Sequence, residues 1–423
     1  MLDLSNNGLT GSIPSAIAKL HSLQYMDFGN NKLTGSVPAS LSNLSSLSWL
    51  VLENKSLSGT ISPSFGDLPY LNTFSLAGNN LVGDIPPSLG NLSFLTELRF
   101  ARNYFSGKIP HSLGNLYGFN HLSLGVNMLT GTIPPSFGNL LNLVYLGLQF
   151  NNLVGVIPPS LFNISSLQKL DMQNNRLGGI LPDYFGEKFP HLRGLALNGN
   201  KFHGHIPLSL FNCSMLNIVQ LDNNSFYGTI PSSVGNLKIL LKLRLDYNML
   251  EANQAADWAF LDALTNCSHL QVLQLSFNRL RGVLPNSLSN LSTSLERLEI
   301  LNNEIEGNIP EGIGGLTNLM ALYMGPNLLT GPIPSSLGTL SKLNVISLVE
   351  NRLSGEIPPT LGNLTQLIEF YLTGNELTGQ IPPSLGKCSL GILSLGNNNL
   401  TGKIPNEVFL ADTIGLFIGL FLG

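Results

Sequence analysis

The sequence predicts an α/β solenoid, a right-handed superhelix of about 17 stacked repeats with a parallel inner β-sheet. Three observations predict it: one asparagine recurs about every 24 residues, alternating leucines precede it, and a Gly-x-Ile-Pro segment follows most copies. A fixed period of roughly 20–50 residues is typical of repeat architectures. Because one repeat cannot bury its own leucines, neighbouring repeats must stack into a continuous core.

The recurring asparagine sets the register of the repeats. Leucines such as Leu146 and Leu148 precede it and alternate with other residues, the pattern of a short strand with one buried face. The asparagine amide can bond the backbone of the turn that follows, so that buried peptide groups keep partners. The position is occupied by Asn7, Asn31, Lys55, Asn79, Asn103, Asn127, Asn151, Asn175, Asn200, Asn224, Asn248, Asn278, Asn303, Asn327, Asn351, Asn375 and Asn398.

A glycine and an Ile-Pro pair follow the strand in most repeats. Gly11, Gly131 and Gly355 permit a positive φ or a close approach of the backbone. Ile133-Pro134 fixes an extended segment with one packed side chain, because proline holds φ near about −65°. We expect a second, outer strand or a polyproline turn at this segment.

One repeat breaks the register. Residues 251–263 replace the Gly-x-Ile-Pro segment with an Ala-rich stretch, and Trp258, Leu261 and Leu264 recur at the three-residue steps of one helix face. We expect a short helix, capped by Asn253, that interrupts the outer strand and covers the underlying leucines. The apolar stripe favours a structural role over a functional module.

The composition argues against nucleic acid as a partner and against catalysis. Only 11% of the residues are charged and the formal net charge is −4, so the chain carries no basic field. No Ser-His-carboxylate set or P-loop is present, and His203-Gly-His205 has no third ligand for a metal. Asp27-Phe28-Gly29 matches a kinase triplet, but the other kinase motifs do not accompany it. We therefore predict no enzyme activity, no cofactor and no metal.

The three cysteines, Cys213, Cys267 and Cys388, share one column in which other repeats carry leucine. The nearest two are two repeats apart, roughly 10 Å by strand spacing, which is beyond the reach of a disulfide. We expect buried thiols.

The repeat closely resembles the plant-specific leucine-rich repeat over residues 2–405, and LTGTIPPSFGNL at 129–140 is a specific example. The run DWAFLDALTNCS at 257–268, followed by LPNSLSNLS at 284–292 and SLGKCS at 384–389, is most similar to the receptor-like kinase subfamily that contains immune receptors. This resemblance implies a plant-type leucine-rich-repeat ectodomain, displayed on the extracellular face of the plasma membrane, that senses peptides in defence signalling.

The sequence departs from that family at its ends. The family usually adds Cys-paired caps, a transmembrane helix and a kinase, and none of these nor a signal peptide occurs here. We expect a solenoid over 1–406 and a hydrophobic tail over 407–423 whose apolar part is too short to span a bilayer. Uncapped ends would expose apolar rungs, so we expect an aggregation-prone fragment, attached to a membrane only through a parent transmembrane segment.

Ten N-x-[ST] sequons indicate an extracytoplasmic origin. Six of them share one column on the predicted convex side: Asn43, Asn91, Asn163, Asn212, Asn266 and Asn363. Three lie beside the asparagine ladder on the predicted concave side, Asn54, Asn223 and Asn399, and the tenth is Asn290.

The outward residues between the leucines are the candidates for ligand binding. From the fifth repeat they become charged and aromatic, which in a chain so poor in charge is typical of interface hot spots. A peptide or protein ligand of mixed charge is expected on the concave face. The candidate residues are Arg99, Arg102, Tyr104, His121, Met128, Tyr145, Gln149, Phe150, Lys169, Asp171, Gln173, Arg176, Lys242, Arg244, Asp246, Tyr247, Phe277 and Arg279.

Two functions from different classes remain open. The first is a receptor ectodomain that binds a peptide and recruits a co-receptor protein. The second is a secreted or membrane-tethered receptor-like protein, or an inhibitor that occludes a wall-degrading enzyme. The number of repeats favours the receptor, because the inhibitors of this family are shorter.

Overall fold

The chain is built from short, similar coils. A computed structural model describes residues 1–409. They fall into two compact units, Met1–His203 and a second that begins at Gly204, and both contain the same kind of coil. The hydrophobic tail expected at 407–423 lies, from residue 410 onward, outside the described residues.

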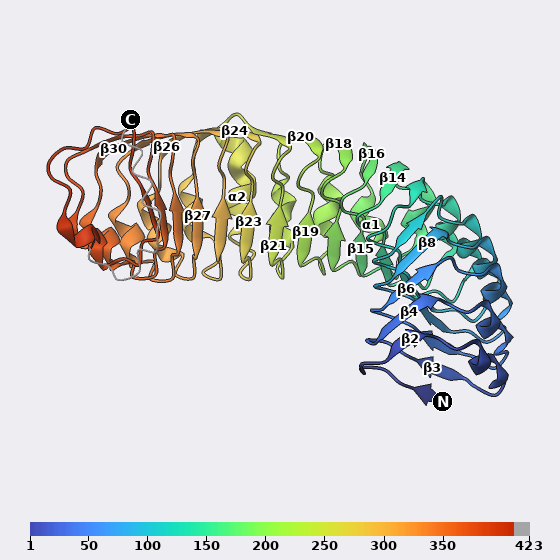
Figure 1. Ribbon diagram of the computed structural model, residues 1–423. Helices are drawn as coiled ribbons and strands as arrows, with labels where there is room; N and C mark the ends of the chain where they lie inside the picture. Colours follow the sequence, from blue (N-terminus) through green and yellow to red (C-terminus); the bar gives the residue numbers. More distant parts are fainter. Residues whose placement is uncertain (410–423) are drawn as a thin grey trace. The chain divides into compact units, whose positions relative to one another are not determined.

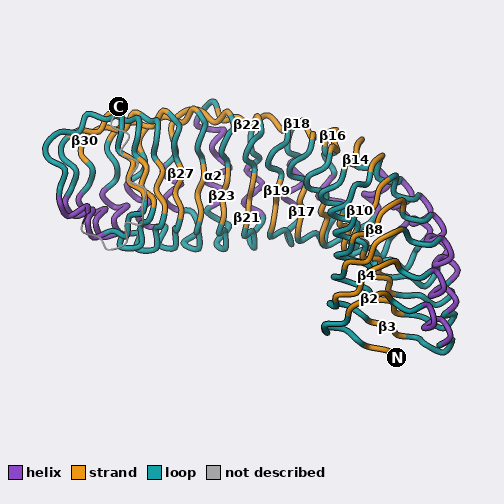
Figure 2. The backbone as a smooth tube through the Cα atoms, in the orientation of Figure 1, coloured by secondary structure: helices purple, strands orange, loops and turns teal. Residues whose placement is uncertain are grey.

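Each coil runs from an inner strand to an outer strand and then to a helix on the opposite side (Figures 1 and 2). In one coil these are β7 (Thr73–Ser75), β8 (Asn80–Asp84) and the 3-10 helix η4 (Pro87–Asn91). The middle residue of the inner strand points into the core, where Phe74 is fully buried. The ladder asparagine, Asn79 in this coil, separates the two strands.

The inner strands are parallel and in register, so that Leu146 lies opposite Leu122 and Leu170 on its two neighbours. This confirms the predicted parallel inner sheet. In the first unit they are β1 (Leu2–Asp3), β3 (Tyr25–Asp27), β5 (Trp49–Val51), β7, β9 (Glu97–Arg99), β11 (His121–Ser123), β13 (Tyr145–Gly147), β15 (Lys169–Asp171) and β17 (Gly194–Ala196). In the second they are β19 (Ile218–Gln220), β21 (Lys242–Arg244), β23 (Val272–Gln274), β25 (Arg297–Glu299), β27 (Ala321–Tyr323), β29 (Val345–Ser347), β31 (Glu369–Tyr371) and β33 (Ile392–Ser394).

The predicted outer strand is present, but it lies before the Ile-Pro pair and does not include it. The outer strands end before this pair, and all except β22 end at or next to a glycine with a positive φ, 78° at Gly131. They are β2 (Thr10–Ser12), β4 (Lys32–Ser36), β6 (Ser56–Gly59), β8, β10 (Tyr104–Ser106), β12 (Thr130–Gly131), β14 (Asn152–Gly155), β16 (Arg176–Ile180), β18 (Lys201–Gly204), β20 (Ser225–Gly228), β22 (Met249–Ala252), β24 (Arg279–Val283), β26 (Glu304–Asn308), β28 (Leu328–Gly331), β30 (Arg352–Glu356) and β32 (Glu376–Thr378).

The Ile-Pro pair instead begins a helix. Ile133 is buried, and Pro134, with φ −62°, is the N-cap of η6 (Pro135–Asn139). The repeat pattern did not predict these short helices. The others are η1 (Ser15–Lys19), η2 (Ala39–Asn43), η3 (Pro63–Asp67), η5 (His111–Asn115), η7 (Pro159–Asn163), α1 (Phe185–Lys188), η8 (Leu208–Asn212), η9 (Ser232–Asn236), η11 (Asn286–Asn290), η12 (Glu311–Gly315), η13 (Ser335–Thr339), η14 (Pro359–Asn363), η15 (Pro383–Lys387) and η16 (Asn406–Phe409).

The asparagine ladder satisfies backbone groups of two adjacent coils, as predicted. Asn151 is buried, and its Nδ2 donates to the carbonyls of Leu148 and Gln149 in its own coil, at 3.1 and 3.3 Å. The same nitrogen donates to the Leu124 carbonyl of the preceding coil at 3.1 Å. Its Oδ1 accepts the N–H of Leu129 at 3.0 Å. One side chain therefore bonds one coil to the next.

The insert is helical, as predicted. Its N-cap residue and its effect on the outer strand differ from the prediction. It forms η10 (Ala255–Trp258) and α2 (Ala259–Leu264). Gln254, not Asn253, is the N-cap, because its side chain and that of Asp257 form a reciprocal capping box. The outer strand is not interrupted either, since β22 pairs with both β20 and β24.

The side chains of the insert close the core. Trp258 and Phe260 are buried, and the Trp258 indole N–H donates to the Arg281 carbonyl at 3.0 Å. Helix α2 packs against η9 of the preceding coil. The structure thus supports the prediction that this segment covers the leucines beneath it.

The cysteines lie in the core, as predicted. Cys213, Cys267 and Cys388 are all buried. Burial raises the pKa of Cys213 to about 12 and that of Cys267 to about 11. Such thiols stay protonated at neutral pH and are poor nucleophiles.

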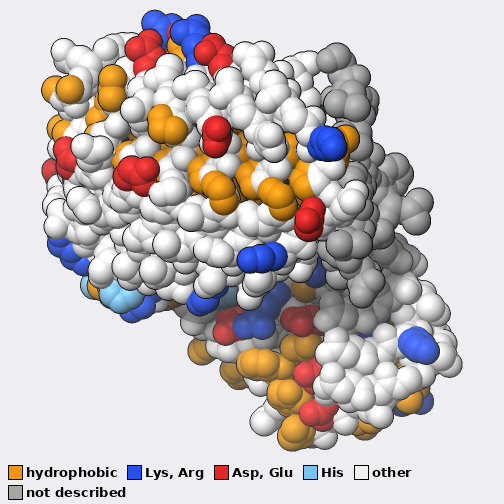
Figure 3. All heavy atoms as spheres, turned by 90° about the vertical axis from the view of Figure 1, so that its left-hand side faces the viewer, with side chains coloured by type: hydrophobic (Ala, Val, Ile, Leu, Met, Phe, Trp, Pro, Cys, Tyr) orange, Lys and Arg blue, Asp and Glu red, His pale blue; other side chains and the backbone are white. Residues whose placement is uncertain are grey.

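The first and last described coils expose apolar residues that are buried elsewhere. Leu4 and Leu9 are exposed in the first coil, whereas their counterparts in the second coil, Phe28 and Leu33, are buried. In the last coil Leu393 and Leu395 are partly exposed. Figure 3 looks onto that coil and shows a row of hydrophobic side chains across it.

Candidate ligand-binding face

The structure separates the candidate residues into two groups. The first lies on the inner strands or at the second position after them, on the exposed face of the inner sheet, called here the strand face. It consists of Arg99, His121, Tyr145, Gln149, Lys169, Asp171, Gln173, Lys242, Arg244 and Asp246.

The second group corrects the prediction that all candidates face outward on the inner sheet. These residues flank the ladder asparagine, where the chain turns away from the inner sheet and into the outer strand. We call the position directly before the asparagine the edge column, and the candidates there are Arg102, Phe150, Tyr247 and Phe277. We call the position directly after it the flank, and the candidates there are Tyr104, Met128, Arg176 and Arg279.

In the first unit the strand face carries a continuous row of interacting side chains. Glu97 and Arg99 form an ion pair at 2.7 Å. His121 and Tyr145 stack with ring centroids 4.6 Å apart, and the Lys169 ammonium lies 5.3 Å from the Tyr145 ring centre. These contacts hold long side chains in fixed positions before any ligand arrives, which reduces the entropy lost on binding.

Burial sets the protonation of this row. It is the main cause that lowers the pKa of His121, with Arg99 as the next, so the imidazole is neutral at neutral pH. It also raises the pKa of Tyr145 and that of Asp171. Asp171 is buried and accepts a hydrogen bond from the Gln173 Nε2 at 3.1 Å. It therefore positions Gln173 and is itself little exposed to a ligand.

Two glycines let the larger side chains lie flat. A Cβ on Gly125 would come within 2.3 Å of the Gln149 side chain, and one on Gly147 within 2.5 Å of the Tyr145 hydroxyl. Alanine at either position would lift these side chains off the sheet. The strand face therefore depends on residues of both kinds, large ones that interact and small ones that make room.

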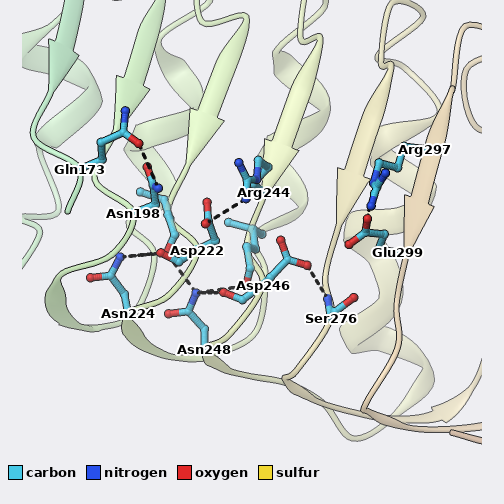
Figure 4. Close-up of polar contacts among 12 residues, drawn as sticks. Gln173, Asn198, Asp222, Asn224, Arg244, Asp246, Asn248, Ser276, Arg297 and Glu299 are labelled. Carbon is cyan, nitrogen blue, oxygen red and sulfur yellow. Dashed lines mark hydrogen bonds and ion pairs between the residues drawn. The ribbon is translucent and has the colours of Figure 1, made fainter. Parts of the chain in front are cut away.

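In the second unit the strand face carries carboxylates and arginines on neighbouring coils (Figure 4). Asp222 pairs with Arg244 at 3.3 Å, and Arg297 pairs with Glu299. Asp246 has no such cation and accepts the backbone N–H of Ser276 at 2.9 Å. Burial raises its pKa to about 7, and the carboxylates of Glu299 and Asp222 add to this effect.

The edge column adopts a left-handed backbone in nearly every coil. Asparagine or glycine occupies most of these positions, as expected for a positive φ. The exceptions are Arg102, Val126 and Phe150 in three consecutive coils, with φ of 59°, 58° and 52°, and in the second unit Tyr247, Phe277 and Glu350. The rings of Tyr247 and Phe277 stack at 4.1 Å. Bulky residues are thus held in a disfavoured conformation beside the strand face.

Val126→Asn is expected to stabilise the protein by about 1 kcal/mol, because asparagine tolerates the positive φ that a β-branched residue disfavours. The midpoint of thermal unfolding should rise. Val154 is the matched control, since it is equally exposed, 40% for both, but lies in β14 without a positive φ. A similar rise for Val154→Asn would contradict the strain at Val126.

Sequence reasoning missed several residues of the strand face. Glu97, Asp222, Ser276, Arg297 and Glu299 were not among the candidates, although each occupies the same repeat position as a candidate that was chosen. The signal that could have found them is a polar residue at the same repeat position in consecutive coils. Gln173, Asn198, Asp222 and Asp246 form such a series.

The sequon asparagines are all exposed. Those of the predicted column end the short helices, as Asn91 ends η4 and Asn163 ends η7, except Asn266, which lies after α2. Asn290 ends η11 in the same way, so the column has one more member than predicted. Asn54 and Asn223 belong to the edge column. Within residues 1–409, no helix has the length and apolarity to traverse a lipid bilayer.

Two family models match the sequence. The one described as "Leucine rich repeat" matches residues 1–57. The other, "Leucine Rich Repeat", matches 70–92, 94–116, 119–140, 142–164, 166–187, 269–291, 342–364, 366–388 and 389–409.

Among curated proteins, the chain is similar to the receptor kinase-like protein Xa21 of Oryza sativa subsp. japonica. The two are 50% identical over 90 residues, which make up 21% of this chain and 9% of Xa21. The match therefore spans less than a tenth of that relative.

Two solved structures cover nearly all of the chain. The plant peptide hormone receptor RGFR1, in complex with RGF2, is 34% identical with a TM-score of 0.83, over 97% of this chain and 73% of that one. The Arabidopsis receptor kinase HAESA, in complex with the peptide hormone IDA and the co-receptor SERK1, is 33% identical with a TM-score of 0.76. That match covers 99% of this chain and 77% of that one.

Proposed function

Because the chain belongs to the leucine-rich-repeat family and is built like the ectodomains of plant receptor kinases, we propose that it is the ligand-sensing region of a plant receptor-like kinase. The strand face binds a linear peptide, and a co-receptor protein docks beside it. The parent protein is a glycoprotein of the plasma membrane and carries this region on the extracellular side. This region recognises the ligand and performs no catalysis.

The edge column is the observation that carries this proposal. Arg102, Val126 and Phe150 keep a left-handed backbone where asparagine or glycine would fit without strain. Strain of this kind persists where a side chain is needed at a particular place. All three stand directly beside the row formed by Arg99, His121, Tyr145 and Lys169.

A peptide fits this face better than a compact ligand. The interacting side chains are spread over successive coils, which are about 4.8 Å apart. An extended peptide advances about 3.3 Å per residue and can therefore contact several coils in turn. In support, RGFR1 and HAESA were both solved with peptide ligands.

The triple variant Tyr145→Ala, Phe150→Ala, Arg176→Ala is expected to bind peptides at least tenfold more weakly, because it removes aromatic and arginine anchors. The probe is a positional-scanning library of fluorescein-labelled synthetic decapeptides, titrated against the chain in an anisotropy assay. Circular dichroism should be unchanged, because all three side chains lie at least partly in solvent.

The matched control removes exposed residues from the turns that precede two inner strands and from the end of η1. Tyr70→Ala with Phe94→Ala and Lys19→Ala deletes two exposed rings and one exposed cation. Binding by this variant should equal that of the wild type. Equal binding by all three proteins would remove the strand face from the proposal, and absence of binding by the wild type would reject peptide sensing at this face.

The defence role rests on the resemblance of residues 257–268 to the receptor-like kinase subfamily that contains immune receptors. A chimera that joins this chain to the transmembrane helix and kinase of a reporter receptor should respond to bacterial peptide extracts. A response only to extracts of uninfected plant tissue would instead favour a hormone receptor.

A further inference from the structure

Three buried polar side chains stand side by side on the strand face of the second unit. Asp222 is 7% exposed, Asp246 5% and Ser276 2%. Each lies two residues after an inner strand, β19, β21 and β23 respectively, and these strands pair in register. Neighbouring members of the set are therefore about 4.8 Å apart, the distance between adjacent strands.

Two atoms of this set have no hydrogen-bond partner among residues 1–409. Asp222 uses one carboxylate oxygen to bind Arg244, while its Oδ1 is buried and unpaired. The Ser276 Oγ is also buried and unpaired. Buried polar atoms in folded proteins nearly always have partners, so these two mark a place where a donor is missing.

The ion pairs around the set leave out one carboxylate. Among residues 1–409, Arg244 is paired with Asp222 and Arg297 with Glu299, while Asp246 forms no ion pair. Its Oδ1 accepts only the Ser276 N–H. When Asp246 is ionised, this part of the strand face carries one carboxylate without a cation. A buried or half-buried carboxylate of this kind favours a cation strongly.

We propose that Asp222, Asp246 and Ser276 form a binding site for one cationic side chain of the peptide ligand, that of arginine or lysine. The proposal rests on the function proposed above and assigns one position of the ligand. A guanidinium has five N–H donors in a plane, and it can bond the free oxygen of Asp222 and the carboxylate of Asp246 together.

The neighbouring aromatic pair fits the same ligand. Tyr247 and Phe277 directly follow Asp246 and Ser276 in the chain, and their rings stack at 4.1 Å with an angle of 10° between planes. Cationic and planar groups pack favourably on aromatic faces. Since both residues have a positive φ, the chain holds this pair at the edge of the carboxylate site against a backbone preference.

The proton on Asp246 makes the site sensitive to pH. Its carboxyl faces Asp222 and Glu299, which favour the neutral form, and Arg244, which favours the ionised form. Because its pKa is raised to about 7, the carboxylate forms as the pH rises through about 7. The affinity for a cation should therefore increase over that range.

The test uses two pools of fluorescein-labelled synthetic decapeptides without histidine, which differ only in a single fixed position, arginine or its neutral analogue citrulline. The wild-type chain should bind the arginine pool at least tenfold more tightly at a pH of about 8. The double variant Asp222→Asn, Asp246→Asn should lose this preference. It keeps the acceptor oxygen for the Ser276 N–H, and its melting temperature reports on folding.

Two further variants complete the experiment. Asp27→Asn, on β3 of the first unit, should leave the preference for arginine unchanged. The single variant Asp246→Asn should abolish the rise of the preference between about pH 6 and about pH 8.

Each remaining outcome is decisive. Equal binding of the two pools by the wild type, or a preference that survives the double variant, would overturn the cation site and leave peptide binding intact. Binding of neither pool would overturn both the site and the proposed function.

Discussion

Asn151→Ala is expected to lower the free energy of unfolding around its coil by about 3 kcal/mol. The substitution removes four hydrogen bonds, two of which join adjacent coils, and leaves the buried N–H of Leu129 without its partner. The carbonyl of Leu124 keeps its bond from Asn127. A buried N–H left unpaired costs about 1–3 kcal/mol, and the loss of the other bonds of Asn151 adds to this cost, which makes it a large local effect. It should be larger than that of any single substitution on the strand face.

The measurement is hydrogen–deuterium exchange followed by mass spectrometry. Long repeat arrays need not unfold in one step, so exchange resolved along the chain is more informative than a single melting temperature. Peptides that cover residues 124–153 should exchange faster, and peptides from distant coils should not change. Asn152→Ala, next to the ladder and partly exposed, should change local stability by less than about 0.5 kcal/mol. Equal effects of the two variants would contradict the role of the ladder.

Lys55→Asn is expected to stabilise the protein by about 2 kcal/mol at neutral pH. Lys55 occupies the ladder position of the third coil, is buried, and donates its ammonium to the carbonyl of Phe28. Lysine has no acceptor, so it cannot accept a backbone N–H as Asn79 accepts that of Leu57. Asparagine at this position would restore both kinds of bond and remove a buried charge.

The pH dependence follows from the pKa of Lys55, which burial lowers to about 8 although Asp27 and Glu53 oppose the shift. The unfolded chain, with a lysine pKa of about 10.4, binds this proton more tightly than the folded one. The destabilisation is therefore complete below pH 8 and fades as the pH rises from about 8 to about 10.4.

Chemical unfolding of both proteins at about pH 7 and about pH 9.5 checks this prediction. The advantage of Lys55→Asn should shrink at the higher pH. Lys32→Gln, which neutralises an exposed lysine of the neighbouring outer strand, should show neither the gain nor the pH dependence. A loss of stability in Lys55→Asn would show that the lysine fits the ladder better than asparagine.

The sequence was sufficient to predict the coil because the same structural residues recur in nearly every repeat. The alternating leucines Leu146 and Leu148, the ladder asparagine and the positive-φ glycine each have one structural solution, and the structure has all three. The insert was predictable only in part, because it does not follow the repeat. Its apolar stripe predicted burial of Trp258, whereas the cap at Gln254 depends on a contact with Asp257 that no period reveals.

The candidate face was predictable in composition but not in geometry. The sequence indicated which coils carry aromatic and charged residues, yet it could not distinguish the strand face from the edge column. That distinction depends on the backbone, since Phe150 has a positive φ and Tyr145 lies on an inner strand. Nor could it show that Asp171 and Asp246 are buried.

Photo-crosslinking tests most directly whether the strand face binds peptide. One variant carries benzoylphenylalanine in place of Ser123, which lies on β11 in the strand face. The other carries it in place of Ile180, which is exposed on the outer strand β16 of the same unit. After irradiation with the decapeptide library, we expect peptide adducts at position 123 and not at position 180. Adducts at 180 alone, or equal yields at both positions, would contradict peptide binding at the strand face.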